Sequence, residues 1–586
     1  MIQRRNSGWQ KKIALLSLLV AVPGVASSSS AQTASSASAC ADIGNVTLSP
    51  GFCATTFADN LGHARHMVVA PNGVVYVNTW SGRYYANDKP PAGGFLLALK
   101  DGGAGKAATV ERFGDSQEQG SAGGTGIALY NGFVYAEMND RIVRYKLPAN
   151  GMSPTGKSET VLSGMPLEGD HPMHPFTIDA KGNIFVNMGS ASNACQVANR
   201  QETSPGASPC KELETRGGIW RYDANKLGQV FSPAERYATG IRNAVGVALD
   251  GAGRLFTTQH GRDQLAQNWP ALYKAEQGAD LPAEELMQVE RGNDFGWPMC
   301  YFDGAQQKLV LAPEYGGDGG KAVGLCAQKK APTAFFPAHW APNDIAFYTG
   351  TQFPAPFRNG AFVAFHGSWN RAPGPQAGYN VVFQPMADGK PSGSYVVFAD
   401  GFAGAKKEPG QAAFRPTGLA IAPDGTLYIA DDTHGRIWSV TFQGPANAQI
   451  AAAPAPAISG LSPEASPEPT LALSTLPLPP GVTLAQLTLG SNIYKGEAKG
   501  GTCGGCHGSD AKGSPVGPGL VSGPWIWGDG SLKSITNIVT KGVPKPKRST
   551  GVMPPMGGVK LSKSDVAAVS AYVWAIGHAD QAPKAK

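Results

Sequence analysis

Residues 418–432 read GLAIAPDGTLYIADD, and this stretch decides the fold class. Two runs of alternating β-branched and aromatic residues flank a Pro-Asp-Gly turn, a pattern that predicts a β-hairpin. Five other stretches repeat the layout: HMVVAPNGVVYVNT (66–79), GIALYNGFVYAEM (126–138), FTIDAKGNIFVNMGS (176–190), GVALDGAGRLFTTQHG (246–261), and DIAFY with FRNGAFVAFHGSW (344–348 and 357–369).

Repeated antiparallel modules predict a mainly β protein, and six copies predict a six-bladed β-propeller. The copies follow one another at roughly 50–70 residues, with one wider gap. A β-sandwich would not explain why the modules share one internal layout. The composition agrees, since 76 Gly, 46 Pro and only 16% charged residues favour turn-rich β-structure over helical bundles.

The composition of the two ends differs from that of the repeats. Residues 1–31 combine basic residues, a short apolar run and small residues, which predicts a signal peptide and export to the periplasm. The propeller is expected over 40–444, and a Pro/Ala/Ser-rich linker over 445–483. Residues 484–580 show helical periodicity and are expected to form a small all-α cytochrome c domain. No other stretch approaches 18 apolar residues, so we expect the mature protein to be soluble.

The helical end contains CGGCH at 503–507. In such a motif the thiols of Cys503 and Cys506 attach covalently to one haem c, and His507 ligates its iron. About 50 residues later, GVMPPMGG offers Met553 or Met556 as the opposite ligand. We favour Met553, because it starts a Met-Pro pair ahead of the last helix, and expect Met556 to pack at the haem edge.

The remaining cysteines form pairs that are close in sequence. An exported protein favours disulfides, and we predict Cys40–Cys53, Cys195–Cys210 and Cys300–Cys326, although six cysteines allow 15 connectivities.

The formal net charge is +6, and residues 484–586 contain 12 Lys and Arg against 5 Asp and Glu. This basic end serves either solubility or the docking of an acidic external electron acceptor. No nucleic-acid-binding motif accompanies it.

Several loop motifs in the repeats carry a resemblance: GDHPMHPF (169–176), IRNAVG (241–246), GRDQL (261–265), FGWP (295–298), HGSWNR (366–371) and RPTGLAIAPDG (415–425). Together with the haem motif they resemble the soluble quinoprotein glucose/sorbosone dehydrogenase family, in its L-sorbosone dehydrogenase branch. The resemblance covers residues 45–443 and the haem domain. It implies pyrroloquinoline quinone (PQQ), Ca²⁺, and oxidation of L-sorbosone or a related aldose or aldehyde at C1. Electrons would then reach the haem and an external cytochrome or quinone chain.

The resemblance also implies roles for single residues. His171 matches the catalytic base, Asp170 would orient it, and His174 is the competing candidate, otherwise a solvated histidine at the pocket rim. Arg242 and Asn243 match residues that touch the quinone, and an arginine there would stabilise charge on the reactive carbonyl.

Arg415 matches a further cofactor-binding arginine. Relatives often carry a second arginine two residues later, where this chain has Thr417, so His366 or His339 would serve that cofactor carboxylate. Trp369 lines the channel or belongs to the core.

The metal is expected on the backbone carbonyls of Gly261 and Arg262, with Asp263 adding a carboxylate oxygen.

Two other functions remain open from the sequence. One is a metal-dependent propeller lactonase, and the other is a sugar-binding propeller that merely accompanies a cytochrome. The sequence does not distinguish a lactone from an acid as the product of the favoured reaction.

Overall fold

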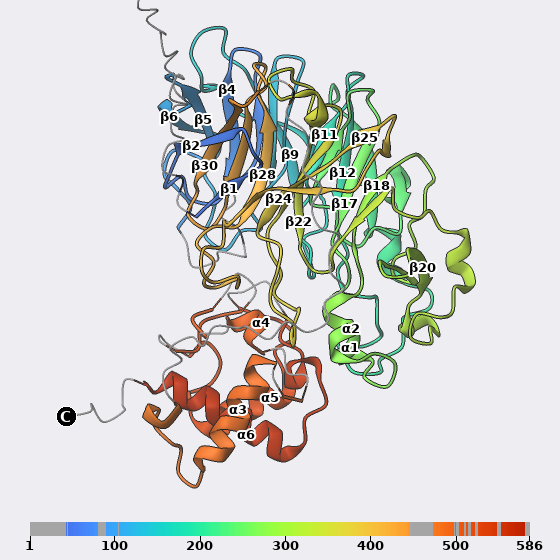
Figure 1. Ribbon diagram of the computed structural model, residues 1–586, viewed down its shortest axis with the longest axis vertical. Coiled ribbons are helices and arrows are strands. Elements are labelled where there is room, and N and C mark those ends of the chain that lie inside the picture. Colours follow the sequence, from blue (N-terminus) through green and yellow to red (C-terminus); the bar gives the residue numbers. More distant parts are fainter. Residues whose placement is uncertain are drawn as a thin grey trace, which may run out of the picture. The chain divides into compact units, whose positions relative to one another are not determined.

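The computed structural model describes residues 43–579, apart from 44, 80–81, 83–88, 104, 446, 448–472, 497, 500–502, 509–510, 514–516, 522–524 and 548–551. The expected signal peptide, Cys40 and most of the expected linker lie outside the described residues. The described chain is mainly β up to Phe442 and helical from Leu484 onward (Figure 1).

Six sheets of four or five strands form the blades of a propeller, as predicted. The first contains β3 (Ala64–Val69), β4 (Val74–Thr79), β5 (Leu96–Asp101) and β6 (Ala107–Phe113). The second contains β7 (Ile127–Tyr130), β8 (Phe133–Met138), β9 (Arg141–Lys146), β10 (Glu159–Ser163) and β14 (Gln229–Val230). The third contains β11 (Phe176–Ile178), β12 (Asn183–Met188), β13 (Gly218–Asp223) and β15 (Arg236–Thr239).

The fourth blade contains β16 (Val247–Leu249), β17 (Leu255–Gln259), β18 (Glu284–Gln288) and β21 (Ala334–Phe336). The fifth contains β22 (Pro342–Phe347), β23 (Ala361–Phe365), β24 (Asn380–Gln384), β27 (Val396–Asp400) and β1 (Thr47–Leu48). The sixth contains β28 (Pro416–Ile421), β29 (Leu427–Asp431), β30 (Ile437–Phe442) and β2 (Phe52–Ala58). Each predicted hairpin supplies the first two strands of one blade.

The first strands of the blades contact one another in a closed ring, in the order β3, β7, β11, β16, β22 and β28, and β28 returns to β3. These are therefore the inner strands around the central channel. Apolar side chains fill the space between neighbouring blades. Between the first and second blades, for example, Tyr76 and Leu96 pack with Val134 and Val143, all of them buried.

The ring closes by joining the two ends of the propeller chain. β2 pairs antiparallel with β30, with Thr55 opposite Ser439. Phe52 on β2 makes edge contacts with four other rings, at centroid distances of 4.7–4.9 Å: Phe353, Phe357, Phe398 and Phe442. A blade made from both ends leaves no open edge between the first and last repeats.

Short elements fill the loops of the propeller. They are the hairpin β19 (Cys300–Asp303) and β20 (Lys308–Leu311), the hairpin β25 (Met386–Ala387) and β26 (Lys390–Pro391), α1 (Leu265–Asn268), α2 (Ala275–Asp280), and the 3₁₀ turns η2 (Lys211–Glu214), η3 (Pro233–Glu235), η4 (Pro313–Tyr315), η5 (Gly324–Gln328) and η6 (Ala355–Phe357).

Disulfides crosslink two of these loop regions. The predicted bonds Cys195–Cys210 and Cys300–Cys326 are confirmed, with Cα–Cα distances of 6.1 and 5.9 Å. Cys53 is also disulfide-bonded, and its predicted partner lies outside the described residues.

The C-terminal domain contains α3 (Leu484–Lys495), α4 (Cys503–His507), α5 (Leu532–Lys541) and α6 (Lys563–Gly577), with η7 (Leu473–Thr475) ahead of them and η8 (Pro555–Gly558) before α6. A Ser562–Asp565 capping box starts α6. None of the described helices is long and apolar enough to cross a membrane.

Candidate active site

The candidate residues of the propeller gather where the inner strands begin. Arg65 is the second residue of β3, while His171, Arg242 and Arg415 lie within five residues before β11, β16 and β28. Propellers commonly build their sites at such positions around the central channel. All four side chains line one cavity of the propeller, although they come from four different blades.

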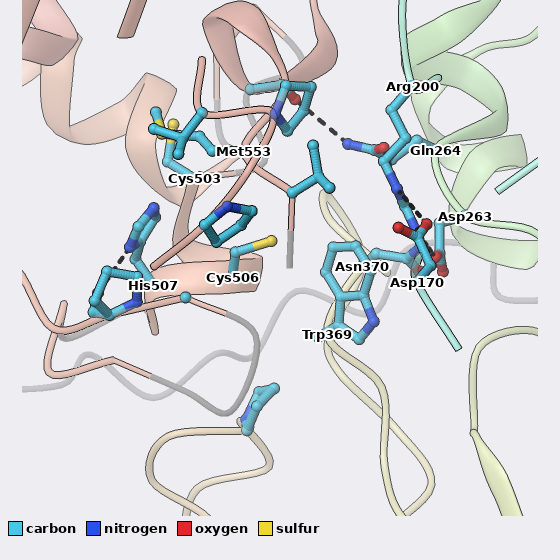
Figure 2. A pocket seen from close by; sticks show the side chains of 18 of the residues that line it. Asp170, Arg200, Asp263, Gln264, Trp369, Asn370, Cys503, Cys506, His507 and Met553 are labelled. Carbon is cyan, nitrogen blue, oxygen red and sulfur yellow. Dashed lines mark hydrogen bonds and ion pairs between the residues drawn. The ribbon is translucent and has the colours of Figure 1, made fainter. Parts of the chain in front are cut away.

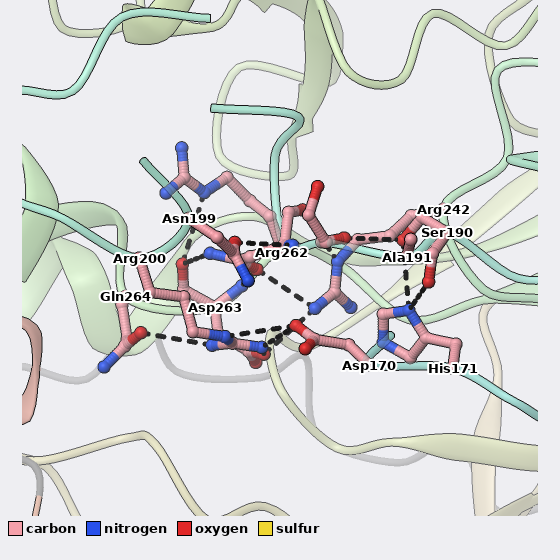
Figure 3. Close-up of polar contacts among 12 residues, drawn as sticks. Asp170, His171, Ser190, Ala191, Asn199, Arg200, Arg242, Arg262, Asp263 and Gln264 are labelled. Atoms are coloured by element: carbon pink, nitrogen blue, oxygen red, sulfur yellow. Dashed lines mark hydrogen bonds and ion pairs between the residues drawn. The ribbon is translucent and has the colours of Figure 1, made fainter. Parts of the chain in front are cut away.

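His171 is 7% exposed, and its Nδ1 faces two oxygens of Ser190. The backbone carbonyl lies 2.9 Å away and the hydroxyl oxygen 3.0 Å away (Figure 3). The Ser190 hydroxyl donates its own hydrogen to the carbonyl of Ser192 at 2.7 Å. Both Ser190 oxygens can then only accept, so His171 carries its proton on Nδ1 and keeps Nε2 as a base.

Two physical effects keep His171 neutral. Burial lowers the pKa of His171 well below 6.5, and the positive charge of Arg242 lowers it further. A neutral imidazole is the form that can accept a proton from a substrate hydroxyl.

The resemblance implies that Asp170 orients His171. The Asp170 carboxylate accepts hydrogen bonds from Arg200, at 2.9 Å from Nη2 and 3.2 Å from Nε. Arg200 also binds Asp263 at 3.0 Å, and the three side chains face one another (Figure 2). Ser190 orients the His171 ring, because the short Gly189-Ser190 segment after β12 brings its carbonyl to the ring.

Arg242 is 2% exposed and is bound on every side of its guanidinium. It donates to Asp263 Oδ2 at 3.0 Å and to the carbonyl of Gly261 at 2.9 Å. Nε and Nη2 donate to the backbone and side-chain oxygens of Asn193, both at 3.0 Å. Arg242 is thereby held at the channel wall, in the position expected of a cofactor-binding residue.

These contacts do not fit the calcium ion that the resemblance implies. The Gly261 carbonyl and the Asp263 carboxylate, two of the expected ligands, already bind the Arg242 guanidinium. The Arg262 side chain points elsewhere and forms a buried ion pair of 2.5 Å with Glu314. Within the described ranges, no group of three or more His, Cys, Asp or Glu side chains is arranged to hold a metal ion.

Asn243 fits a ligand in the cavity. It is 3% exposed, and among the described residues its Oδ1 is buried without a hydrogen-bond partner. A side chain at Gly189 would place its Cβ 2.6 Å from the Cβ of His171 and 3.0 Å from this Oδ1. Glycine therefore lets the two functional side chains approach each other.

Arg415 presents a buried cation at the other side of the channel. It donates to the carbonyls of His366 and Gly367 at 2.9 and 3.0 Å. No carboxylate of the described chain lies within ion-pair distance of it. A buried guanidinium whose hydrogen bonds go to carbonyls is well suited to an anionic ligand.

His366 lines the same cavity and binds Asp432 at 2.7 Å. Burial and the nearby Arg415 lower the pKa of His366 to about 4, so the ring is neutral at neutral pH. Asp432 is fully buried and also binds Arg65 at 2.5 Å.

His339 also lines the cavity, but its Nε2 faces the carbonyls of Gly278 and Leu281 at 2.9 and 3.0 Å. The His339 ring therefore stabilises the C-terminal end of α2 through Nε2. Trp369 is partly exposed and lines the cavity (Figure 2), as expected for the channel alternative.

His174 is fully buried, and the expectation of a solvated rim histidine is wrong. Its backbone N–H donates to the buried Glu137 at 2.6 Å, and its Nε2 faces the carbonyl of Pro166 at 2.9 Å. These contacts give His174 a structural role, which favours His171 as the base.

The haem motif forms the short helix α4, which places Cys503 and Cys506 one turn apart. His507 is 8% exposed, and its Nδ1 lies 2.8 Å from the carbonyl of Pro518. The carbonyl holds the proton on Nδ1, so Nε2 is available for iron. The cavity beside α4 is lined by Tyr494, Leu520, Ile535, Val539, Val569 and Val573.

The same cavity distinguishes the two candidate methionines. Among the described residues, Met553 lines it together with Cys503, Cys506 and His507 (Figure 2), whereas Met556 does not. The lining therefore agrees with Met553 as the second axial ligand. The apolar wall, the fixed histidine and the two cysteines fit a covalently bound haem.

Several site residues were missed from the sequence: Arg65, Ser190, Asn193, Arg200, Asn370 and Asp432. Arg200, for instance, belongs to the irregular loop that the Cys195–Cys210 disulfide closes. Asn370, Asp432 and Ser190 lie inside quoted stretches, but only the meeting of separate loops gives these residues a role. Candidate residues recur near the start of the inner strands, and the same position in the first repeat could have indicated Arg65.

The fold and the site together define a propeller–cytochrome c fusion protein. The chain belongs to the TrAA12-like family, whose model matches residues 46–443. The cytochrome c family model matches residues 488–577.

Three matches to known proteins are informative. A pyrroloquinoline quinone-dependent pyranose dehydrogenase of Coprinopsis cinerea is 28% identical over 298 residues, which cover 44% of this chain and 38% of that protein. The chain thus matches well under half the length of this relative. A Trichoderma reesei AA12 structure has a TM-score of 0.54 at 20% identity, covering 68% of this chain and 98% of that one.

The holo form of the Coprinopsis cinerea pyranose dehydrogenase PQQ domain has a TM-score of 0.53 at 20% identity, covering 68% and 97%. At this identity the structural likeness shows the propeller fold. The assignment to the L-sorbosone branch stays a prediction.

Proposed function

We propose that this protein is a periplasmic quinohaemoprotein dehydrogenase that oxidises a sugar at C1 and passes the electrons to its own haem c. The observation that carries the proposal is the neutral, oriented His171 in a channel that also presents buried arginines. The family membership and the PQQ dependence of the Coprinopsis cinerea relative support it.

The channel residues fit pyrroloquinoline quinone as the cofactor. Arg415 would hold an anionic group of the cofactor, Arg242 would add positive charge to the channel wall, and the unsatisfied Oδ1 of Asn243 would accept from the ring N–H of the cofactor. When bound, this quinone supplies a two-electron acceptor for hydride. We do not include calcium in the proposal, because Gly261 and Asp263 already bind the Arg242 guanidinium.

His171 would act as the general base. Its Nε2 would take the proton from the C1 hydroxyl while the C1–H bond breaks and the C=O bond forms. The Ser190 carbonyl would stabilise the imidazolium through Nδ1–H, and Arg242 would favour return of the proton to solvent by like charge.

We propose L-sorbosone or a related aldose as substrate, on the strength of the loop motifs. A cyclic hemiacetal would give a lactone, and an aldehyde hydrate would give an acid. Both products follow from the same loss of one hydride and one proton.

Export to the periplasm is part of the proposal. The composition of residues 1–31 and the two disulfides support it, since such bonds persist in oxidising compartments. From haem c, electrons would leave one at a time to an external cytochrome or quinone chain.

The first test is an anaerobic visible spectrum of the full-length protein reconstituted with the quinone. Addition of L-sorbosone or a panel of aldoses should produce the bands of reduced haem, and protein without quinone should show none. If substrate leaves a dithionite-reducible haem oxidised, the dehydrogenase function is excluded, and lactone hydrolysis and sugar binding are the next assays.

The second test exchanges the proposed base. His171→Ala should keep quinone and haem bound while turnover falls about 10²- to 10⁴-fold, as expected when a general base is lost. His174→Gln is the matched control and should lower thermal stability with little loss of turnover in the folded fraction. Near-normal turnover of His171→Ala would contradict the assignment.

A further inference from the structure

We infer that Glu212 is a positioning residue for the reaction: it holds the backbone segment 190–192 in the conformation that orients the base His171. The inference rests on the proposed function, in which His171 takes the substrate proton. Glu212 is not among the described residues that line the channel cavity, so it would act on the reaction only through this segment.

The Glu212 carboxylate binds three donors of the segment. Its Oε2 accepts from the backbone N–H groups of Ala191 and Ser192, at 2.8 and 3.0 Å. Its Oε1 accepts from the hydroxyl of Ser192. Hydrogen bonds to a carboxylate are stronger than those to a neutral acceptor, so one side chain fixes two consecutive residues.

The peptide bond between Ser190 and Ala191 links Glu212 to His171. The Ala191 N–H and the Ser190 C=O belong to one planar trans peptide and point in opposite directions. Glu212 binds the N–H at 2.8 Å, and the C=O faces His171 Nδ1 at 2.9 Å. Because the peptide is rigid, the carboxylate that fixes the N–H also sets the direction of the carbonyl.

The chain around Glu212 secures this contact. Glu212 lies on η2, two residues after Cys210, and the Cys195–Cys210 disulfide ties the start of η2 to the loop that follows the segment. The buried Arg216, two residues after η2, donates to the carbonyl of Gly189 at 3.0 Å. Glu212 and Arg216 thus bind the N–H groups and a carbonyl of the same short stretch of backbone.

Removal of the carboxylate should free this peptide to rotate. Nδ1–H of His171 would then lose its acceptor, and the proton can move to Nε2, the nitrogen that must stay unprotonated to act as a base. Burial and Arg242 lower the pKa of His171, whereas the Ser190 carbonyl raises it. Loss of the carbonyl should therefore lower this pKa further.

The test is steady-state kinetics of quinone-reconstituted full-length protein across pH. Glu212→Ala should lower kcat by up to about 10²-fold, as expected when a reacting group is misplaced by about 1 Å. KM should change little, and the acid limb of kcat/KM should move to lower pH. Glu212→Gln keeps an acceptor oxygen and should lose less of kcat, whereas an effect of charge alone would be equal in both variants.

Asp179 provides a matched control in the same blade. Its carboxylate also accepts from two backbone N–H groups, those of Lys181 and Asn183 at 2.9 and 2.8 Å, but in the turn between β11 and β12. Asp179→Ala should destabilise the blade and leave kcat and the acid limb unchanged. If Glu212→Ala behaves in the same way, its role is merely structural and the inference is overturned.

A second measurement does not depend on turnover. ¹⁵N NMR of histidine-labelled, dithionite-reduced protein, with His171→Ala to assign the ring, should show Nδ1–H in wild type and a mixture of tautomers in Glu212→Ala. Glu212→Gln takes the place of Glu212→Ala if the latter fails to fold. An unchanged tautomer would overturn the inference.

The two measurements separate this inference from the proposed function. A tautomer that changes in the variant, in a protein whose haem no sugar reduces, would overturn the function and leave Glu212 as the residue that orients the ring. Normal turnover in both wild type and Glu212→Ala would leave the function standing without this role for Glu212.

Discussion

At the scale of single residues, the chemistry depends on which nitrogen of His171 carries its proton. The two Ser190 oxygens place the proton on Nδ1, and burial together with the cationic surroundings keeps the ring neutral. A histidine with an ordinary pKa near 6.5 would be partly protonated in mildly acidic conditions. Burial and the nearby arginines thus protect the base form of His171.

This arrangement predicts the acid limb of the pH profile. Activity requires neutral His171 and is lost as the pH falls through its lowered pKa, so the limb of kcat/KM should lie below pH 6.5. Arg200→Gln removes one charge that lowers this pKa, so the limb should move to higher pH.

Steady-state assays with a dye acceptor across pH would measure the shift. Arg144→Gln, a blade arginine that pairs with Glu159, is the control and should leave the limb in place. A limb that stays at the same pH in Arg200→Gln would exclude His171 as the titrating group.

The second residue-scale prediction concerns the haem ligand. Met553→Ala should lower the haem reduction potential and slow electron exit, because loss of a thioether ligand favours the oxidised iron. Met556→Ala, the matched control, should change the potential little, since Met556 does not line the described cavity. A spectroelectrochemical titration distinguishes them, and the opposite result would assign Met556 to the iron.

At the scale of elements, the haem domain depends on the packing of α3 against α6. A Cβ at Gly490 on α3 would collide with the backbone carbonyl of Ala568 on α6. The rings of Tyr494 and Tyr572 pack across the same pair of helices at 5.3 Å. Close approach of the two backbones therefore requires glycine at this position.

Gly490→Ala gives opposite expectations from propensity and from packing. Intrinsic helix propensity would stabilise α3 by about 1 kcal/mol, whereas separation of α3 and α6 should destabilise the domain by about 1–3 kcal/mol. We expect a net loss of stability. Ala485→Gly, on the exposed side of α3, should cost about 1 kcal/mol from propensity alone.

Thermal unfolding followed by the haem Soret band would measure both changes. A more stable Gly490→Ala protein would show that α3 and α6 do not pack as described.

At the scale of the whole molecule, the propeller is held together by the pairing of its two chain ends. β2 joins β30 in the last blade, and Phe52 contributes an aromatic cluster with residues from 300 positions further along the chain and beyond. These contacts join the first and last segments of the propeller chain, so the closed ring depends on them.

Phe52→Ala should therefore destabilise the propeller by about 3–5 kcal/mol, as expected for a large buried aromatic side chain. Thermal unfolding followed by far-UV circular dichroism would show the loss, with the haem spectrum unchanged. Phe133→Ala, where the ring packs inside one blade and is partly exposed, is the control and should cost less. Equal effects would argue against a special role for ring closure.

The sequence by itself determined the features that depend on local order. The six hairpins and the helical periodicity around the haem motif were predicted correctly, because alternation, turn residues and fixed spacing act over a few residues. Two of the predicted disulfides joined cysteines 15 and 26 residues apart.

Only the tertiary structure decided how the channel is built. It paired Asp170 with Arg200, placed Ser190 on His171 and put Arg242 on the expected metal ligands. The partners lie 19 to 30 residues apart in sequence, in irregular loops with no repeating pattern. Their charges and hydrogen bonds act through space across the channel, so no local pattern in the chain encodes them.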